Sequence, residues 1–167
     1  MKLTPANSTE FPALYEALAE AFPENERRDR ADALALLDRT DYRLLRIEEG
    51  GKRVGLFSLF DLGDFLFIEH FLTLPEFRNR GLGAMALSLL ATRPLVLEAE
   101  RPDTPMAERR LAFYGRNGFF INPLDYAQPP YRKTDAPTPM LLLSSPTPLC
   151  DPLRAVKAIY QTVYRIS

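Results

Sequence analysis

Residues 78–83 read Arg-Asn-Arg-Gly-Leu-Gly, between an apolar, strand-like run at 65–74 and a helix-like run at 84–90. Glycines let backbone N–H groups approach phosphate oxygens closely. The first turn of the following helix presents unpaired donors and a partial positive charge. Arg78 and Arg80 add full charges at the rim. The stretch therefore predicts a loop that binds a pyrophosphate group.

A second landmark lies downstream, where residues 111–119 read Leu-Ala-Phe-Tyr-Gly-Arg-Asn-Gly-Phe. The pair resembles the GNAT superfamily of acetyl-CoA-dependent N-acetyltransferases. In that family the loop reads Gln/Arg-x-x-Gly-x-Gly/Ala, and a later helix ends in Phe-Tyr-x-x-x-Gly-Phe. Arg78, Gly81 and Gly83 fill the fixed loop positions, and the resemblance covers roughly residues 3–143. Ala107 is a departure, because many members carry there an asparagine that contacts the cofactor.

Hydrophobic patterning predicts the elements around these motifs. Residues 42–48, 53–62 and 65–74 are strand-like runs joined by tight, glycine-containing connections, which is typical of an antiparallel meander. Apolar residues recur at helical spacing after Phe11, and a short second helix is expected at 28–37. Further helices are expected at 81–91 and 106–117, with strands at 95–99, from 119 and at 140–143.

The resemblance implies an α/β acetyltransferase fold: a single-domain, mixed, mostly antiparallel twisted sheet flanked by helices. We expect the N-acetyltransferase domain to span residues 1–145. Residues 146–167 form a tail with an amphipathic helix at 151–164. That helix packs either on the domain or on a second subunit, so the protein is expected to be a monomer or a homodimer.

The family's cofactor and proton-donor positions carry over residue by residue. The strand before the loop would supply a backbone N–H donor for the reacting carbonyl oxygen. Tyr114 of the Phe-Tyr motif would give a proton to the leaving thiolate. The residues implied in acetyl-CoA binding are Phe71, Leu72, Thr73, Arg78, Asn79, Arg80, Gly81, Leu82, Gly83, Ala84 and Tyr114.

Glu69 is our candidate for the general base, because a carboxylate in an apolar strand is costly unless it has partners or a task. His70 is the alternative, and a water molecule could relay the proton to either. Because side chains alternate along a strand, we expect Glu69 and His70 to face opposite sides of the sheet.

Two further segments are candidates for holding the acceptor amine. One is the turn at 23–28, which includes Glu26 and covers the acceptor end of the cleft in the family. The other is the proline-rich stretch at 122–139, where Tyr126 and Tyr131 supply aromatic faces. An alternative for this second stretch is a purely architectural role, at the sheet edge or in a dimer contact.

Composition narrows the class of protein. The chain has 167 residues, 26% of them charged, and a net charge of −1, so it lacks the basic character of a nucleic-acid-binding domain. Its start has no apolar run like that of a signal peptide, and no stretch is apolar enough to span a membrane. One cysteine, Cys150, and one histidine make a metal site improbable. We expect a cytoplasmic enzyme that uses acetyl-CoA, needs no metal, and acetylates a small-molecule or peptide amine.

Two alternative functions belong to other classes of protein. The fold could serve as a non-catalytic CoA-binding module, which the departure at Ala107 favours. Gly81-x-Gly83-x-x-Ala86 also satisfies the dinucleotide fingerprint, with Glu98 or Glu100 as the ribose acid. Against this oxidoreductase, the preceding strands look antiparallel and too few residues follow for a doubly wound sheet.

Overall fold

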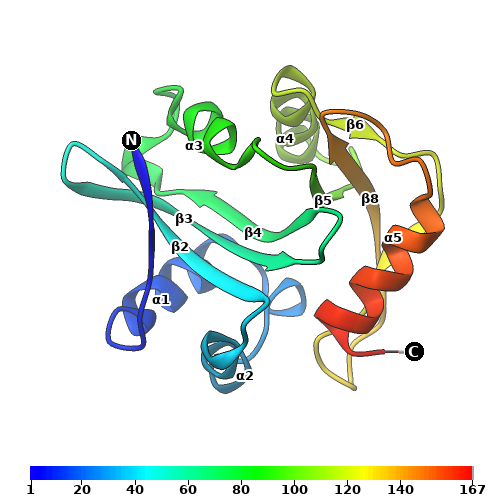
Figure 1. Cartoon of the computed structure of the whole chain (residues 1–167), viewed down its shortest axis with the longest axis horizontal. Coiled ribbons are helices and arrows are strands. Elements are labelled where there is room, and N and C mark those ends of the chain that lie inside the picture. The colour runs from blue at the N-terminus through cyan, green and yellow to red at the C-terminus, as the bar shows by residue number, and fades with distance from the viewer. Residues whose placement is uncertain (167) are drawn as a thin grey trace.

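The computed structural model describes residues 1–166; Ser167, the end of the predicted tail, lies outside the described residues. A single twisted sheet crosses the molecule, with helices on both faces (Figure 1). Its strands are β1 (Lys2–Pro5), β2 (Tyr42–Glu49), β3 (Lys52–Asp61), β4 (Leu66–Thr73), β5 (Leu95–Glu100), β6 (Phe120–Ile121), β7 (Tyr126–Gln128) and β8 (Thr138–Ser145). The helices are α1 (Phe11–Ala21), α2 (Arg30–Ala35), α3 (Leu82–Leu90), α4 (Pro105–Arg116) and α5 (Pro152–Ile159).

The sheet has the order β1-β2-β3-β4-β5-β8-β6, with β7 also paired to β8. The expected meander is confirmed, because β2, β3 and β4 pair antiparallel in sequence order. Strand β4 pairs parallel with β5, and α3 makes the crossover between them. The sheet is therefore mixed and mostly antiparallel, as expected.

Strands β4 and β5 stay together for only a short distance. Their register runs from Leu66 opposite Leu95 to Ile68 opposite Leu97. Beyond that point β4 continues beside β3, whereas β5 continues beside β8 as far as Glu100. The sheet thus opens into a gap between the second halves of β4 and β5.

A bulge interrupts β4 beside this gap. Ser58 on β3 lies opposite His70 and Leu59 lies opposite Ile68, so Glu69 is an extra residue on β4. A bulge breaks the alternation of side chains. The expectation that Glu69 and His70 face opposite sides is therefore wrong: both line one pocket.

Two hydrophobic clusters cover the two faces of the sheet. On one face α1, α2 and α5 contribute buried side chains such as Leu14, Ala33 and Ile159. On the other face α3 and α4 contribute Leu87 and Tyr114, among others. Burial of apolar side chains on both faces, at about 25 cal/mol per Å² of apolar surface, holds the layers together. Helices therefore cover both faces of the sheet, and the gap leads from one face to the other.

The C-terminal helix differs from the regular helix expected at 151–164. Helix α5 ends at Ile159 and continues as a π-helical turn over Tyr160–Tyr164. Ile159 and Val163 are fully buried on the same face of the sheet as α1. Asp151 caps the start of α5 by accepting a hydrogen bond from the Arg154 N–H at 3.0 Å.

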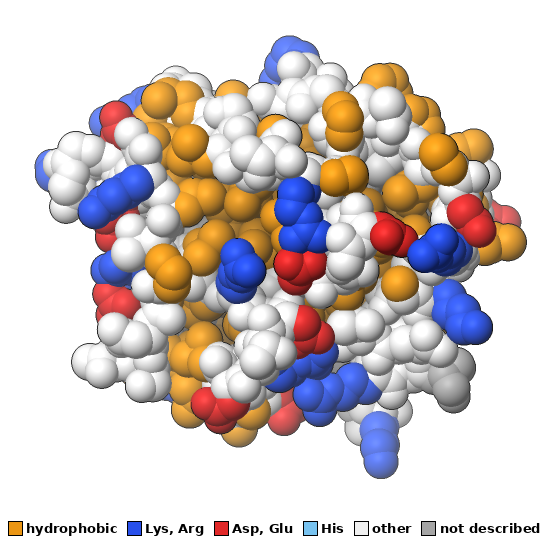
Figure 2. All heavy atoms as spheres, in the orientation of Figure 1, with side chains coloured by type: hydrophobic (Ala, Val, Ile, Leu, Met, Phe, Trp, Pro, Cys, Tyr) orange, Lys and Arg blue, Asp and Glu red, His pale blue; other side chains and the backbone are white. Residues whose placement is uncertain are grey.

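The surface view in Figure 2 shows Lys and Arg interspersed with Asp and Glu on this side of the molecule. Opposite charges also pair on the protein surface, as in the 2.9 Å contact between the exposed side chains of Arg154 and Asp64. None of the helices in the described residues is both long and apolar enough to cross a membrane.

Candidate active site

The glycine loop joins the end of β4 to α3 on one face of the sheet. Gly81 is the N-cap of α3 and has φ +74°, a left-handed conformation that favours glycine. Gly83 serves packing: a Cβ there would lie 3.2 Å from Cζ of Phe113 and 3.5 Å from Cζ of Phe71. The loop thus leaves the first N–H groups of α3 unpaired and brings the helix close to α4 and β4.

The predicted cofactor residues are continuous along this face. Phe71, Leu72 and Thr73 end β4 beside the gap, and Leu82 and Ala84 lie with Gly83 in the first turn of α3. The loop residues Arg78, Asn79, Arg80 and Gly81 are exposed. Arg78 Nε donates to the Thr73 carbonyl at 3.1 Å, and Arg80 lies over the Phe77 ring.

Tyr114 lies on α4, on the same face as the loop. Its ring packs edge-to-face on Phe113 and on Phe119, and only 7% of the residue is exposed. Burial raises the pKa of its hydroxyl to about 12, so the group keeps its proton near neutral pH. Ala107 is buried near the start of the same helix, and its N–H donates to the Thr104 side chain at 3.1 Å.

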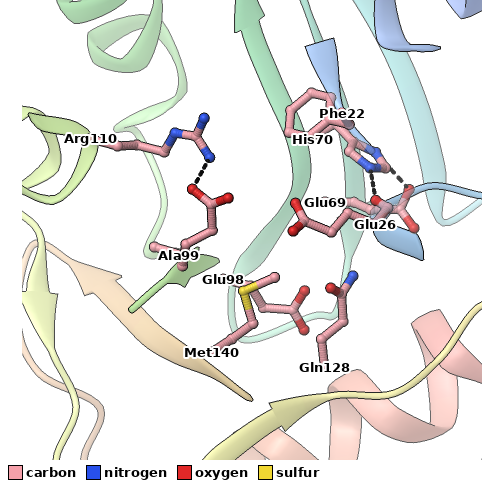
Figure 3. A pocket seen from close by; sticks show the side chains of 10 residues that line it. Phe22, Glu26, Glu69, His70, Glu98, Ala99, Arg110, Gln128 and Met140 are labelled. Carbon is pink, nitrogen blue, oxygen red and sulfur yellow. Dashed lines mark hydrogen bonds and ion pairs between the residues drawn. The ribbon is translucent and has the colours of Figure 1, made fainter. Parts of the chain in front are cut away.

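A pocket lies in the gap where β4 and β5 separate, and it is lined from the α1 face by Phe22 and from the α4 face by Arg110 (Figure 3). Four carboxylates and one guanidinium line it. The lining residues are Phe22, Glu26, Glu69, His70, Glu98, Ala99, Glu100, Arg110, Gln128 and Met140. No three His, Cys, Asp or Glu side chains within residues 1–166 are grouped to hold a metal ion.

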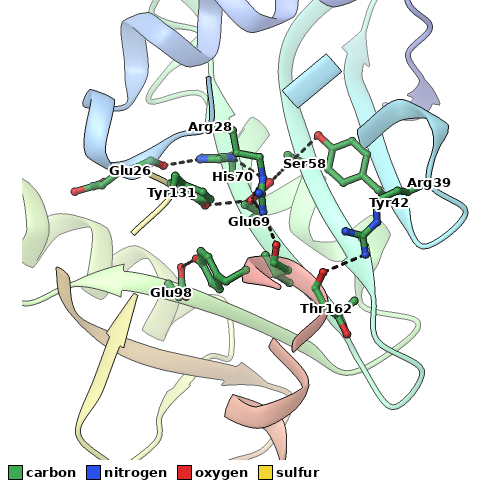
Figure 4. Close-up of polar contacts among 12 residues, drawn as sticks. Glu26, Arg28, Arg39, Tyr42, Ser58, Glu69, His70, Glu98, Tyr131 and Thr162 are labelled. Atoms are coloured by element: carbon green, nitrogen blue, oxygen red, sulfur yellow. Dashed lines mark hydrogen bonds and ion pairs between the residues drawn. The ribbon is translucent and has the colours of Figure 1, made fainter. Parts of the chain in front are cut away.

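Glu69 is fully engaged by neighbours (Figure 4). Arg28 Nε donates to Oε1 at 3.0 Å, the Tyr131 hydroxyl donates to the same oxygen at 3.1 Å, and Ser58 donates to Oε2 at 2.8 Å. Burial by itself would raise the pKa of Glu69, but the charge of Arg28 and the hydrogen bond from Ser58 hold it well below its usual range. Glu69 is thus a firmly ionised carboxylate.

His70 contacts the turn before α2. Its Nε2 lies 2.9 Å from the Glu26 carbonyl oxygen, which can only accept, so Nε2 carries the hydrogen. Nδ1 lies 3.6 Å from Glu69 Oε2, and the ring packs edge-to-face on Phe22. The contact between His70 and the Glu26 backbone thus positions both residues at the pocket.

Glu98 is a second buried carboxylate at the gap. The Tyr164 hydroxyl donates to its Oε2 at 2.7 Å, and the Tyr126 hydroxyl donates to Oε1. No ion pair joins Glu98 to a basic side chain in the described chain. Burial raises the pKa of Glu98 to about 7, although both phenol hydrogen bonds oppose the shift.

The two tyrosines expected to contact the acceptor instead hold carboxylates. Tyr126 is buried on β7 with its hydroxyl on Glu98, and Tyr131 directs its hydroxyl to Glu69 while Arg28 lies over its ring, 4.8 Å from the centroid. Neither residue lines the pocket directly.

The two acceptor segments do meet beside this pocket. Arg132 of the proline-rich stretch donates to Asp29 from Nε at 2.9 Å and also to the Glu24 carbonyl oxygen. The proline-rich stretch thus lies against the turn that carries Glu26. The pocket is enclosed by segments far apart in the sequence.

Sequence patterns missed several residues of the pocket. Glu98 was considered only as a ribose acid in the dinucleotide alternative, although it is a charged residue inside an apolar strand, the same signal that identified Glu69. Gln128, which lines the pocket, and Tyr164, whose hydroxyl contacts Glu98, carry no local signal. Their approach to the gap depends on long-range packing.

The fold also decides against the dinucleotide alternative. The strands that precede Gly81 run antiparallel, and β4 is separated from α3 by an eight-residue connection, residues 74–81. A Rossmann fingerprint requires a strand that leads directly into its glycine turn within a βαβ unit.

Comparison with known proteins agrees with this geometry. A model of the acetyltransferase (GNAT) family matches residues 11–119. A putative acetyltransferase of the GNAT family from Bacteroides thetaiotaomicron is 31% identical, with a TM-score of 0.91 and all of both chains covered. The ribosomal-protein-S18-alanine N-acetyltransferase from Escherichia coli is 19% identical, with a TM-score of 0.61 over 91% of this chain and 97% of that one.

A GNAT family acetyltransferase from Elizabethkingia anophelis, solved with acetyl-CoA bound, is 18% identical, with a TM-score of 0.57 over 86% of this chain and 95% of that one. The comparison with curated proteins gave no match. The family match spans more than half of the chain, and the similarity to the Bacteroides protein extends over its whole length. The chain therefore belongs to the GNAT family of acetyltransferases.

Proposed function

We propose that the protein moves an acetyl group from acetyl-CoA to a primary amine, by direct attack within a ternary complex. The observation that carries the proposal is the gap between β4 and β5, with the glycine loop on one face and the carboxylate-lined pocket in the gap itself. Such a gap lets two ligands meet from opposite faces. Family membership and the acetyl-CoA complex of the Elizabethkingia protein support the choice of donor.

In the proposed complex the pyrophosphate of acetyl-CoA lies against the exposed loop at 78–81 and the N-terminus of α3. Arg78 and Arg80 supply charge-assisted hydrogen bonds. The thioester lies in the gap, where a backbone N–H of β4 near Phe71 or Leu72 stabilises the oxyanion. This arrangement assigns the loop, β4 and Tyr114 to the donor and the opposite face to the acceptor.

The chemistry requires an unprotonated amine. An alkylamine has a pKa near ~10, by analogy with lysine, so it enters the pocket mostly as an ammonium ion. Its nitrogen attacks the thioester carbonyl, the C–N bond forms, and the C–S bond breaks as the thiolate leaves. We assign proton donation to that thiolate to Tyr114, because its hydroxyl keeps its proton.

The geometry changes the expected role of Glu69. A carboxylate held by Arg28 has low proton affinity, so Glu69 suits attraction of the ammonium ion better than removal of its proton. Glu98 carries no cationic partner in the described chain and has a pKa of about 7. A general base works best with a pKa near the working pH, so the proposal assigns proton removal to Glu98.

Titration calorimetry with acetyl-CoA, CoA and NADH, followed by CoA-release assays with a panel of amines, tests the function. We expect acetyl-CoA and CoA to bind, NADH not to bind, and amines to accelerate CoA release. Binding of CoA without amine-dependent release over the panel would favour a non-catalytic CoA-binding module. The oligomeric state, monomer or homodimer, is read from light scattering on the same sample.

A further inference from the structure

The pocket on the acceptor face has an uneven balance of charge. Two of its carboxylates have cationic partners: Glu69 contacts Arg28 at 3.0 Å and Glu100 contacts Arg110 at 2.8 Å. The other two, Glu26 and Glu98, form no ion pair with a basic side chain of residues 1–166. The pocket thus contains two separate carboxylates whose charge the protein leaves uncompensated.

Both uncompensated carboxylates are desolvated. Glu98 lies beneath the phenol rings of Tyr126 and Tyr164. Glu26 lies on the 3₁₀ turn Glu24–Glu26, and its pKa is raised by burial and by the nearby charge of Glu100. Removing an unpaired carboxylate from water is unfavourable, so a cation that enters the pocket gains from pairing with each one.

Gln128 supplies an independent sign of a missing ligand. The residue is 4% exposed, and its Oε1 has no hydrogen-bond partner within the described structure. Figure 3 shows its amide pointing into the pocket, in the region between Glu26 and Glu98. A buried acceptor oxygen without a partner costs stability, and a donor such as an ammonium N–H would satisfy it.

We infer that the acceptor carries two cationic amino groups, as a short aliphatic diamine does. One amino group lies against Glu98 and is acetylated, and the other is held by Glu26, with Gln128 Oε1 accepting an N–H bond from the bound diamine. An amino acid is disfavoured, because its carboxylate would meet Glu26, and Arg110, the cation that lines the pocket, is already paired with Glu100. This inference rests on the proposed function, since it identifies the acceptor of the same site.

Three amines of equal chain length separate the charge patterns: n-butylamine, diaminobutane and γ-aminobutyrate. Initial rates of CoA release are expected to give diaminobutane a kcat/KM at least about tenfold above n-butylamine, the effect of ~1.4 kcal/mol. The rate with γ-aminobutyrate is expected to be the lowest. The same three ligands are titrated calorimetrically into the CoA-bound protein, which reads their affinities without turnover.

Glu26→Gln keeps the shape of the side chain and removes its charge. We expect it to abolish the preference for diaminobutane over n-butylamine, mainly by raising the KM for diaminobutane. Glu24→Gln is the matched control, because Glu24 belongs to the same turn but is 76% exposed outside the pocket. Gln128→Leu should reduce the preference by a smaller factor.

The outcomes distinguish the two proposals. Equal affinities and rates for diaminobutane and n-butylamine would overturn the second amino group while leaving acetyl transfer intact. A preference for diaminobutane that survives Glu26→Gln would overturn the second amino group as well. A calorimetric preference for diaminobutane with no CoA release would support the inference on the acceptor and contradict the proposed reaction.

Discussion

The two buried glutamates at the gap are tuned in opposite directions by their neighbours. The guanidinium of Arg28 keeps the pKa of Glu69 low, whereas Glu98 has only phenol donors and a pKa of about 7. Similar residues on adjacent strands thus acquire different chemistry from side chains that come from distant segments. Pairs of titratable groups whose pKa values are driven apart are typical of acid–base sites.

Glu98 gives stability a pH dependence with a defined sign. Its carboxyl has a pKa of about 7 when folded, against the ordinary value of 4.5, so between these values the folded state binds more protons. Stability from this group therefore falls as pH rises from 4.5 to about 7 and stays lower above it. As pH rises from about 4 to about 8, the unfolding free energy of Glu98→Gln should increase by about 3 kcal/mol relative to that of the wild type.

Urea denaturation at the two pH values measures this gain. Glu108→Gln serves as the control, because it removes the same charge from an exposed position on α4. A constant difference in unfolding free energy between Glu98→Gln and wild type, at both pH values, would contradict the raised pKa.

Among the elements, the turn before α3 permits a controlled test of the cofactor loop. Gly81 and Gly63 have φ +74° and +79°, and a Cβ at either meets no atom within 4 Å. Valine at either position strains the backbone to a similar extent. We expect both variants to lose comparable stability, but only Gly81→Val to lose affinity for acetyl-CoA, by at least about tenfold.

Thermal melts and calorimetry on the two variants provide the comparison. Gly63 lies in the turn between β3 and β4, so it reports the cost of strain alone. Retained acetyl-CoA affinity in folded Gly81→Val would remove this loop from the cofactor site.

Elements with strong local patterns were predictable from the sequence, and those that depend on a partner strand were not. The meander β2–β4 and helices α3 and α4 follow from periodicity and turn residues. Strand β1 is short and partly exposed, and β7 lies among prolines but pairs with β8. The bulge at Glu69 depends on how β3 and β4 align, which single-strand periodicity does not encode.

At the scale of the whole molecule, Arg28 joins three parts of the chain. Its carbonyl accepts from the Tyr15 hydroxyl at 2.8 Å, Nε reaches Glu69, and Nη2 donates to the Val163 carbonyl at 2.7 Å. That carbonyl lies in the last turn of the C-terminal helix, where a cation is favoured by the helix dipole. One residue thus connects α1 through its backbone carbonyl, and β4 and the C-terminal helix through its side chain.

Arg28→Met should lower the free energy of unfolding by about 3–5 kcal/mol, because it leaves Glu69 buried without its cation. The double variant Arg28→Met/Glu69→Met removes the stranded charge and should recover part of the loss. Equilibrium urea unfolding of the wild type, both single variants and the double variant completes the cycle. Additive losses would mean that the ion pair makes no coupled contribution.

The site was predictable as far as its two motifs extend. Residue types and their order point to the glycine loop and to Glu69, and the family resemblance points to the turn with Glu26; the roles of all three stay predictions. The balance of charge in the pocket was not predictable, because it is set by Arg28, Glu98 and Gln128. These residues meet only when the connection between α1 and α2 packs with β5 and β7 around the gap. Long-range packing therefore decides which carboxylate keeps its charge.

The gap between β4 and β5 also bears on aggregation. Unpaired strand edges recruit strands from other chains, and in this sheet the outer edges are the short strands β1 and β6. The edges beside the gap are longer, but helices on both faces and the neighbouring strand enclose them. This enclosure shields the edges from a strand of another copy of the chain. Under the proposed function, the same edges face the bound donor and acceptor.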